Sequence, residues 1–132
     1  MKRVEFLGNI FKSGGLLFLP LALKNKNKEE LKELKIYHNF IRGLSYYDFQ
    51  KVVNQLKEND LLTLKREPSN EFDKYAIEVY WGESKMGYLP RAENKVMANL
   101  MDAGFPLSCT IKQINKNDIL RGIFVHVGMR KI

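Results

Sequence analysis

The stretch REPSNEFDKYAIEV, residues 66–79, has the pattern of a β-hairpin with a long polar turn. Its residues 67–70, Glu-Pro-Ser-Asn, are typical of a turn. Residues 60–66 before this turn alternate between apolar and polar side chains, and residues 76–81 are rich in β-branched and aromatic side chains. Both patterns are typical of strands. We therefore expect two paired strands joined by an exposed loop.

The chain on either side of this hairpin predicts further short elements. Four more strands are expected at residues 36–44, 85–89, 107–114 and 119–127, and two helices at 45–57 and 92–103. Tyr46 lies on the apolar stripe of the first helix, so its ring could belong to the core. The second helix is expected to turn Val96, Leu100 and Met97 inward. Helices inserted between antiparallel strands indicate an α+β fold, a small and partly closed six-stranded β-barrel.

The positive charge is concentrated in the first part of the chain. The 132 residues carry a formal net charge of +7, of which residues 1–35 contribute +4 and residues 36–132 only +3. We interpret residues 1–35 as a basic leader or linker and residues 36–132 as the folded domain. A charge of +3 is a modest indication of a nucleic-acid partner, because many unrelated domains reach it.

The leader has the outline of a secretory signal, with basic residues followed by an apolar run at residues 16–23. Lys12 and the pair Gly14-Gly15 interrupt the apolar segment, and no small-x-small cleavage site follows Leu23. The segment is also too short to cross a bilayer. We expect a cytoplasmic protein without a transmembrane segment, with export as the alternative.

The residues that catalysis or metal binding needs do not form a recognisable pattern. Cys109 is the lone cysteine, which excludes an internal disulfide, and it lies in an apolar strand where a core position is expected. His38 and His126 do not complete a zinc site of known spacing, and His126 is expected to face away from its neighbours on the strand. Phosphate-loop and nucleophile-elbow motifs are absent. We expect a binding module with no enzyme activity, no cofactor and no small-molecule substrate.

The loop of the central hairpin suggests a binding function. Phe72 is an aromatic residue among polar ones, and an exposed ring can stack on a nucleobase. The alternative is that Phe72 anchors the loop to the barrel.

Three sequence blocks resemble the HIRAN domain family. Residues 66–79 resemble its central motif, roughly R-[DE]-P-x-N-x-[YF]-D-x-x-A-[IV]-x-V. The block GLSYY at residues 43–47 and the block MGYLPR at residues 86–91 resemble two further family segments, in the same order. The resemblance covers about residues 37–127. It implies an OB-like barrel of six strands with two helices, found at the front of helicase-like DNA-repair translocases.

The resemblance also implies a site that holds the 3′ end of single-stranded DNA. Tyr46 and Phe72 would stack on the terminal bases, and Asp73 would accept a hydrogen bond from the free 3′-hydroxyl. Asn70 and Tyr88 would offer hydrogen bonds. Arg91 would pair with a phosphate.

Purely structural roles are the alternative for the same residues. Asp73 and Asn70 could only organise the turn, and Arg91 could only shield Glu93. Three positions depart from the family pattern: Ser45 replaces an arginine, Tyr88 replaces a histidine, and Ile119 with Leu120 occupies the place of a further aromatic.

The function we expect is binding of single-stranded DNA at a 3′-hydroxyl end, linked to DNA repair or replication-fork processing. A helicase or nuclease would be a fitting partner. The alternative is a protein-interaction or envelope-associated module that keeps the fold without binding DNA. A third hypothesis is an enzyme of unknown type.

Overall fold

The structure, a computed structural model, describes residues 33–130. Its strands are β1 (Glu33–Phe40), β2 (Leu61–Arg66), β3 (Ile77–Trp81), β4 (Ser84–Tyr88), β5 (Leu107–Ile114) and β6 (Ile123–Arg130). Its helices are α3 (Phe49–Val52) and α4 (Lys95–Asp102), with single 3-10 turns η2 (Leu44–Tyr46), η3 (Val53–Gln55) and η4 (Arg91–Glu93). The leader predicted at residues 1–35 lies outside the described residues up to residue 32, so it remains a prediction.

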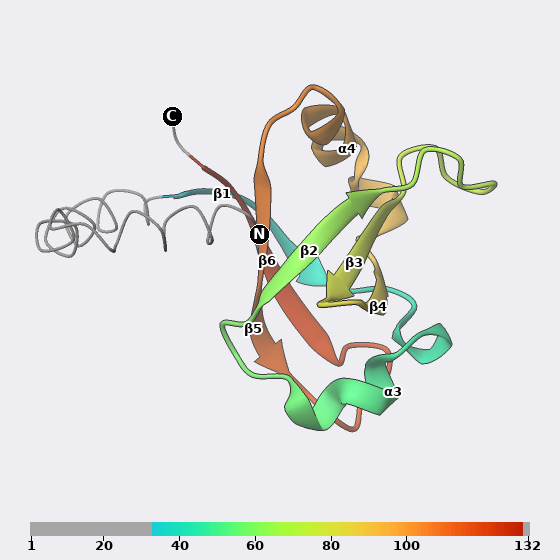
Figure 1. Cartoon of the computed structure of the whole chain (residues 1–132), viewed down its shortest axis with the longest axis vertical. Helices are drawn as coiled ribbons and strands as arrows, with labels where there is room; N and C mark the ends of the chain where they lie inside the picture. Colours follow the sequence, from blue (N-terminus) through green and yellow to red (C-terminus); the bar gives the residue numbers. More distant parts are fainter. Residues whose placement is uncertain (1–32, 131–132) are drawn as a thin grey trace, which may run out of the picture. The chain divides into compact units, whose positions relative to one another are not determined.

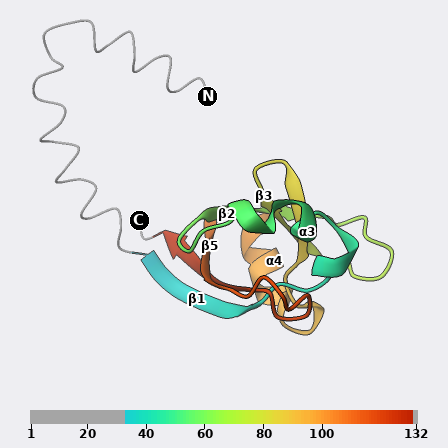
Figure 2. The same cartoon turned by 90° about the horizontal axis from the view of Figure 1, so that it is seen from below.

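The six strands form one curved sheet in the order β1-β6-β5-β2-β3-β4 (Figures 1 and 2). The β2–β3, β3–β4, β2–β5 and β5–β6 pairings are antiparallel. In Figure 1, α3 lies at one end of the sheet and α4 at the other. The predicted α+β, OB-like fold with two short helices is thus confirmed.

Within residues 33–130, a single bridge joins the two edges of the sheet. Arg42, just after β1, forms an antiparallel bridge with Tyr88 at the end of β4. Its N–H donates to the Tyr88 carbonyl at 2.8 Å, and its carbonyl accepts from the Tyr88 N–H at 2.9 Å. The sheet is therefore a partly closed barrel, whose edges are joined at this bridge.

Apolar side chains from strands and helices fill the space inside the curved sheet. Among the fully buried residues are Phe49, Ile77, Met86 and Val125. Cys109 is also fully buried, as predicted, and burial raises the pKa of its thiol to about 12. A thiol of this kind is a packing element rather than a nucleophile, because the reactive thiolate form is suppressed.

The helix predicted at residues 45–57 is wrong in its extent. The structure has only a four-residue α-helix, Phe49–Val52, between the 3-10 turns η2 and η3. Val52 and Val53 are adjacent β-branched residues, which favour an interrupted helix. Because the regular helix starts at Phe49, the helical spacing does not extend back to Tyr46. That residue is 82% exposed and does not belong to the core.

The predicted buried face of the second helix is confirmed at Met97 and wrong at Val96. α4 starts at Lys95, after the separate turn η4, and buries Met97 and Ala98. Val96 is 69% exposed, so its predicted inward position is wrong, while Leu100 is partly buried. Because η4 and α4 are separate, the buried positions of α4 are shifted by about one residue from those expected for an uninterrupted helix starting at residue 92.

The last strand starts later than predicted, at Ile123 instead of Ile119. Asp118 Oδ1 accepts the N–H groups of Leu120 and Arg121, both at 2.9 Å, which holds this segment in a turn. The residues beside His126 are buried, and its own side chain points the other way, as predicted. Within residues 33–130, no helix is long and apolar enough to span a membrane.

Candidate nucleic-acid interface

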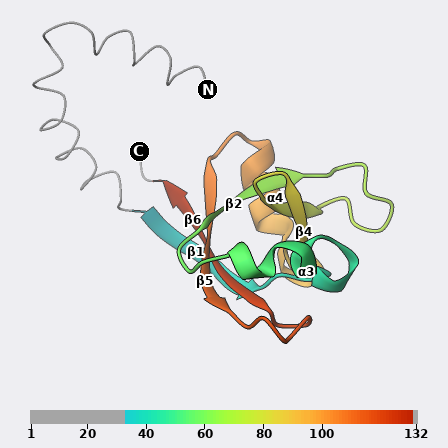
Figure 3. The same ribbon diagram turned by 60° about the horizontal axis from the view of Figure 1, so that its bottom comes forward.

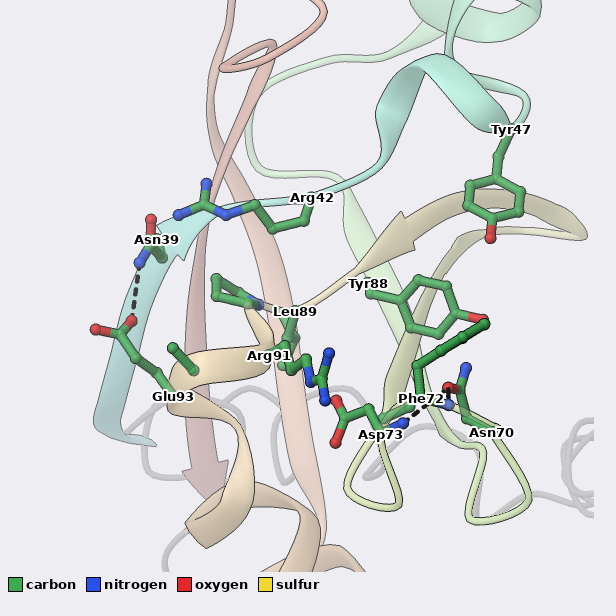
Figure 4. Close-up of a pocket in the computed structure, with 13 residues that line it drawn as sticks. Asn39, Arg42, Tyr47, Asn70, Phe72, Asp73, Tyr88, Leu89, Arg91 and Glu93 are labelled. Carbon is green, nitrogen blue, oxygen red and sulfur yellow. Dashed lines mark hydrogen bonds between the residues drawn. The ribbon is translucent and has the colours of Figure 1, made fainter.

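A pocket of about 690 Å³ lies where the edge strands of the sheet meet (Figure 4). It is formed by the end of β1 and the segment that follows it, the β2–β3 loop, and the segment from the end of β4 into η4. The lining residues are Asn39, Arg42, Tyr47, Asn70, Phe72, Asp73, Ala76, Tyr88, Leu89, Pro90, Arg91, Ala92 and Glu93. Five of the six predicted site residues line this pocket, and Tyr46 does not.

The β2–β3 loop, which extends away from the sheet in Figures 1 and 3, is organised by Asn70. Its Oδ1 accepts the N–H groups of Phe72 at 2.8 Å and Asp73 at 3.0 Å. Its Nδ2 donates to Glu67 Oε1 at 3.0 Å. Asn70 is thus the turn residue that sets the direction of the two side chains after it.

Phe72 projects from this loop, and the residue is 74% exposed. It therefore does not anchor the loop to the barrel, and both the ring and the pocket beside it are accessible. An accessible ring next to a pocket can stack on a planar group such as a nucleobase.

Asp73 has both a turn role and spare acceptor capacity. Its Oδ1 accepts the Tyr75 N–H at 2.9 Å, and its Oδ2 accepts Asn94 Nδ2 at 2.8 Å. Asn94 is only 1% exposed, so the carboxylate is held from the protein side. A carboxylate offers roughly four lone-pair sites, and each oxygen has one protein donor. The remaining sites can accept a donor from a ligand in the pocket.

Arg66 fixes the two ends of the same loop. Its Nη1 donates to the Ala76 carbonyl at 2.6 Å and its Nη2 to the Lys74 carbonyl at 2.9 Å. The guanidinium also forms a two-point ion pair with Asp102 of α4, with Nε–Oδ1 2.9 Å and Nη2–Oδ2 3.2 Å. Arg66 thus ties the loop to α4 and has a structural role.

Tyr88 is held by charged groups behind the pocket. Its hydroxyl donates to Glu67 Oε1 at 2.5 Å and accepts from Lys85 Nζ at 2.8 Å. Lys85 also forms a 2.9 Å ion pair with Glu78. Burial and the hydrogen bond to Glu67 raise the pKa of Tyr88 to about 12. Its hydroxyl is thus already engaged in the protein, and its ring is the part that faces the pocket.

The chain of hydrogen bonds from Lys85 to the loop shifts the other pKa values too. Burial alone would lower the pKa of Lys85, but hydrogen bonds with Tyr88 and Glu78 outweigh it and raise the pKa. Hydrogen bonds from Tyr88 and Asn70 lower the pKa of Glu67 below its usual 4.5. The charged forms of Glu67 and Lys85 are thus both favoured, which stabilises the base of the loop.

This arrangement predicts an acid-dependent contribution of Glu67 to stability. Because its pKa is lower in the folded state, the contribution is present above the unfolded pKa and is lost as the pH falls through the folded value. Urea unfolding measured between about pH 5 and pH 3 should therefore show a smaller loss of stability for Glu67→Gln than for the unchanged protein. Glu71→Gln, in an exposed position of the same loop, should follow the unchanged protein. Equal pH slopes for all three proteins would contradict the role of Glu67.

Two cations border the pocket. Figure 4 shows the Arg91 guanidinium pointing toward the Asp73 carboxylate, and Arg42 on the opposite wall beside Asn39. Within residues 33–130, neither guanidinium forms a hydrogen bond or an ion pair, and Glu93 accepts from Tyr37 and Asn39 instead of pairing with Arg91. Both cations are therefore available to an anion in the pocket.

The HIRAN domain family model matches residues 35–126, and these residues contain the whole pocket. The chain belongs to the HIRAN domain family. HIRAN domains are known as DNA-binding modules in helicase-like proteins, and a HIRAN domain is a binding domain.

Two solved structures have the same fold. A crystal structure of a protein from Lactobacillus plantarum is 22% identical, with a TM-score of 0.69 over 76% of this chain and 98% of that one. The crystal structure of the HIRAN domain of human HLTF is 20% identical, with a TM-score of 0.61 over 74% of this chain and 78% of that one. No curated protein matches the sequence.

Sequence reasoning did not predict the other eight lining residues of this HIRAN domain, and two of these, Arg42 and Tyr47, carry side chains suited to a nucleic-acid ligand. Arg42 reaches the pocket only because the strand bridge brings it beside Tyr88. Tyr47, rather than its neighbour Tyr46, lines the wall, with Lys85 Nζ 4.5 Å from its ring centroid. The block at residues 43–47 contains both tyrosines, and helical spacing could not separate their orientations.

Proposed function

We propose that this HIRAN domain binds single-stranded DNA at its 3′-hydroxyl end. The observation that supports this most directly is the partly satisfied carboxylate of Asp73 in a pocket bordered by Arg42 and Arg91. A carboxylate repels an internal phosphate, whereas it accepts a hydrogen bond from a terminal hydroxyl. Such a site selects ends against the interior of a strand.

The aromatic residues would hold the terminal bases. Phe72 offers an exposed ring at the pocket, and Tyr46 is exposed on η2 close in sequence to the pocket-lining Tyr47. Stacking accepts any base because each base has a π-face. The site would therefore recognise an end and not a sequence.

The cations would hold the phosphates. Arg91 is the predicted phosphate ligand, and Arg42 supplies a second guanidinium in the pocket although Ser45 lacks a basic group. Guanidinium groups pair with phosphate oxygens in a two-point geometry. Asn70 and Tyr88 would act mainly by positioning Phe72 and Asp73, since their polar atoms have protein partners.

The test is the anisotropy of a short labelled single-stranded DNA titrated with the whole chain at two salt concentrations. The arms are a free 3′-hydroxyl, a 3′-phosphate and a circular strand. A clear preference for the free hydroxyl is the expected result. Equal and steeply salt-dependent binding to all three would indicate only a basic surface, and would contradict the proposal.

A second candidate is a protein-interaction module that keeps the fold without binding DNA. The observation in its favour is the engagement of the Tyr88 hydroxyl by Glu67 and Lys85, together with the missing cation at Ser45. Absence of binding to every DNA at both salt concentrations would favour this candidate.

Binding of 3′ ends implies a cellular context. Free 3′ ends of single strands arise in DNA repair and at stalled replication forks, so a helicase or nuclease partner in the cytoplasm would fit. Cell fractionation tests the location, and export of the chain would contradict it.

Replacing Tyr46 with alanine should weaken DNA binding by about 1–3 kcal/mol, the worth of one base stack. The residue is 82% exposed, so the free energy of unfolding should change by less than about 0.5 kcal/mol. Anisotropy and urea unfolding measure the two effects. Phe105→Ala removes a partly exposed ring that does not line the pocket, and it should leave DNA binding unchanged. A Tyr46→Ala protein with undiminished affinity would exclude Tyr46 from the site.

A further inference from the structure

The outward face of β1 and β6 carries four aromatic rings in contact with one another, which we call the aromatic row: Phe40, Phe124, His38 and His126. Ring centroids are 5.0 Å apart for Phe40 and Phe124, 5.6 Å for Phe124 and His38, and 5.7 Å for His38 and His126. The residues that flank Phe124 and His126 on β6 are fully buried, so these two rings point away from the core. The row is therefore not required to fill the interior.

Cationic groups lie along both ends of the aromatic row. The Arg121 guanidinium is 5.9 Å from the ring centroid of Phe40. At the other end, burial and the positive charges of Lys35 and Lys112 lower the pKa of His126. Rings with cations at both ends suit a ligand that carries planar groups and negative charges.

A second pocket joins the aromatic row to the 690 Å³ pocket proposed to hold the 3′ end, which we call the 3′-end pocket. It has a volume of about 580 Å³ and is lined by Asn39, Phe40, Arg42, Leu120 and Arg121. Asn39 and Arg42 also line the 3′-end pocket, so the two pockets share a wall. Among residues 33–130, no acidic residue lines the second pocket. The surface is thus continuous from Asp73 to the row, with the Arg42 guanidinium at the shared wall and Arg121 beyond it; Glu93, which accepts from Asn39 at 2.9 Å, lies on the side of the first pocket.

We propose that this surface binds the nucleotides that precede the bound 3′ end. The strand leaves the end pocket past Arg42 and Arg121 and continues over Phe40 and Phe124 toward the two histidines. The inference rests on the proposed function, because the end pocket determines where the strand begins. Single-stranded DNA fits better than an acidic peptide, since only the nucleic acid supplies a base for each ring and a phosphate for each cation.

The test is calorimetric titration of the whole chain with oligothymidylates of two, four and eight nucleotides, each with a free 3′-hydroxyl. The dissociation constant should fall at least about tenfold from four to eight nucleotides. This is the low end of the gain in affinity expected from one or two further base stacks. Arg121→Glu should remove this gain and leave the dissociation constant for the dinucleotide within about twofold. Phe124→Leu, which keeps apolar volume but removes the ring, should reduce the gain about fivefold.

The matched control is Lys57→Glu. It makes the same charge change at an exposed residue that lines neither pocket. It should keep the gain with length, and circular dichroism should show that all three variants are folded. A polyglutamate competitor at equal charge concentration should not displace the eight-nucleotide strand.

The outcomes separate this inference from the proposed function. A dinucleotide preferred with a 3′-hydroxyl over a 3′-phosphate, but no gain with length, would overturn the extended surface and leave the end site standing. An equal loss in Arg121→Glu and Lys57→Glu, or displacement by polyglutamate, would overturn the surface in the same way. Dinucleotides bound without regard to the 3′ group would contradict the proposed function, and with it the surface as a continuation of a bound end.

Discussion

Replacing Asp73 with alanine is expected to abolish the preference for a 3′-hydroxyl over a 3′-phosphate. A hydrogen bond to a charged group contributes about 1.5–3 kcal/mol, so the ratio of the two dissociation constants should fall about 10- to 150-fold. Weak, salt-sensitive binding should remain, because Arg42, Arg91 and the aromatic residues are unchanged. Anisotropy with the two labelled strands at two salt concentrations measures the ratio.

The turn role of Asp73 requires two further variants. Asp73 also accepts hydrogen bonds from the Tyr75 N–H and from Asn94, so alanine removes supports of the loop as well as a charge. Asp73→Asn keeps an oxygen acceptor for the Tyr75 N–H and removes the charge, and it should also lose the preference. Glu71→Ala removes the same charge two residues away, at an exposed position, and should keep the preference.

Three results distinguish selection from loop damage. If Asp73→Ala discriminates the two strands with the unmutated ratio, the carboxylate does not receive the hydroxyl. If Glu71→Ala loses the ratio to the same extent, the preference is a general effect of negative charge in the loop. Loss in Asp73→Ala and Asp73→Asn together, with Glu71→Ala unaffected, supports the proposed role.

The fold was predictable where the signals are local. The hairpin at residues 66–79 follows from turn chemistry, and in the structure the side-chain oxygens of Asn70 and Asp73 accept the backbone N–H groups that this chemistry implies. The buried position of Cys109 and the outward direction of His126 follow from strand alternation. In each case the residue's neighbours in the chain are sufficient to determine its direction.

Prediction failed where an element is interrupted. Helical spacing placed Val96 on the apolar face and left the core open as an alternative for Tyr46, but each residue lies beside a break between a 3-10 turn and an α-helix. Such a junction changes the rotation per residue, so a pattern that continues across it assigns the wrong face. Spacing alone cannot show the junction, because tertiary packing decides where the regular helix begins.

The site was predictable only in part, because several of its contacts join distant strands. Arg42 lines the pocket through its bridge to Tyr88, and the Tyr88 hydroxyl reaches Glu67 across the sheet. The motif predicted which loop side chains belong to the candidate site, but it did not predict that Arg42 and Glu67 contact Tyr88. A residue whose role depends on long-range pairing leaves no periodic signal in its own neighbourhood.

Replacing Gly87 with alanine should destabilise the domain by about 3 kcal/mol, through overpacking together with backbone strain. Its φ of 151° is one that side chains rarely adopt, and a Cβ would lie 2.2 Å from the Arg42 carbonyl oxygen. That oxygen accepts the Tyr88 N–H in the bridge between the edge strands. The methyl group can be accommodated only if β4 moves away from Arg42, which breaks the Arg42–Tyr88 bridge between the sheet edges.

The loss should be visible in stability and in binding. A change of about 3 kcal/mol corresponds to a midpoint of thermal unfolding lower by about 12–24 °C for a domain of this size. DNA binding should weaken even at temperatures where the variant is folded, since the two bridge residues, Arg42 and Tyr88, both line the pocket. Thermal unfolding by circular dichroism and anisotropy at a low temperature measure the two effects.

Gly82→Ala is the matched control, because the same side chain is added in the β3–β4 turn at a φ of 60° with no heavy atom within 4 Å of the new Cβ. It should cost about 1 kcal/mol, the strain of the left-handed backbone alone. Binding should be unchanged. The difference between the two variants isolates the close approach of β4 to Arg42. If both variants lose the same stability and bind DNA equally well, the Arg42–Tyr88 bridge does not shape the pocket.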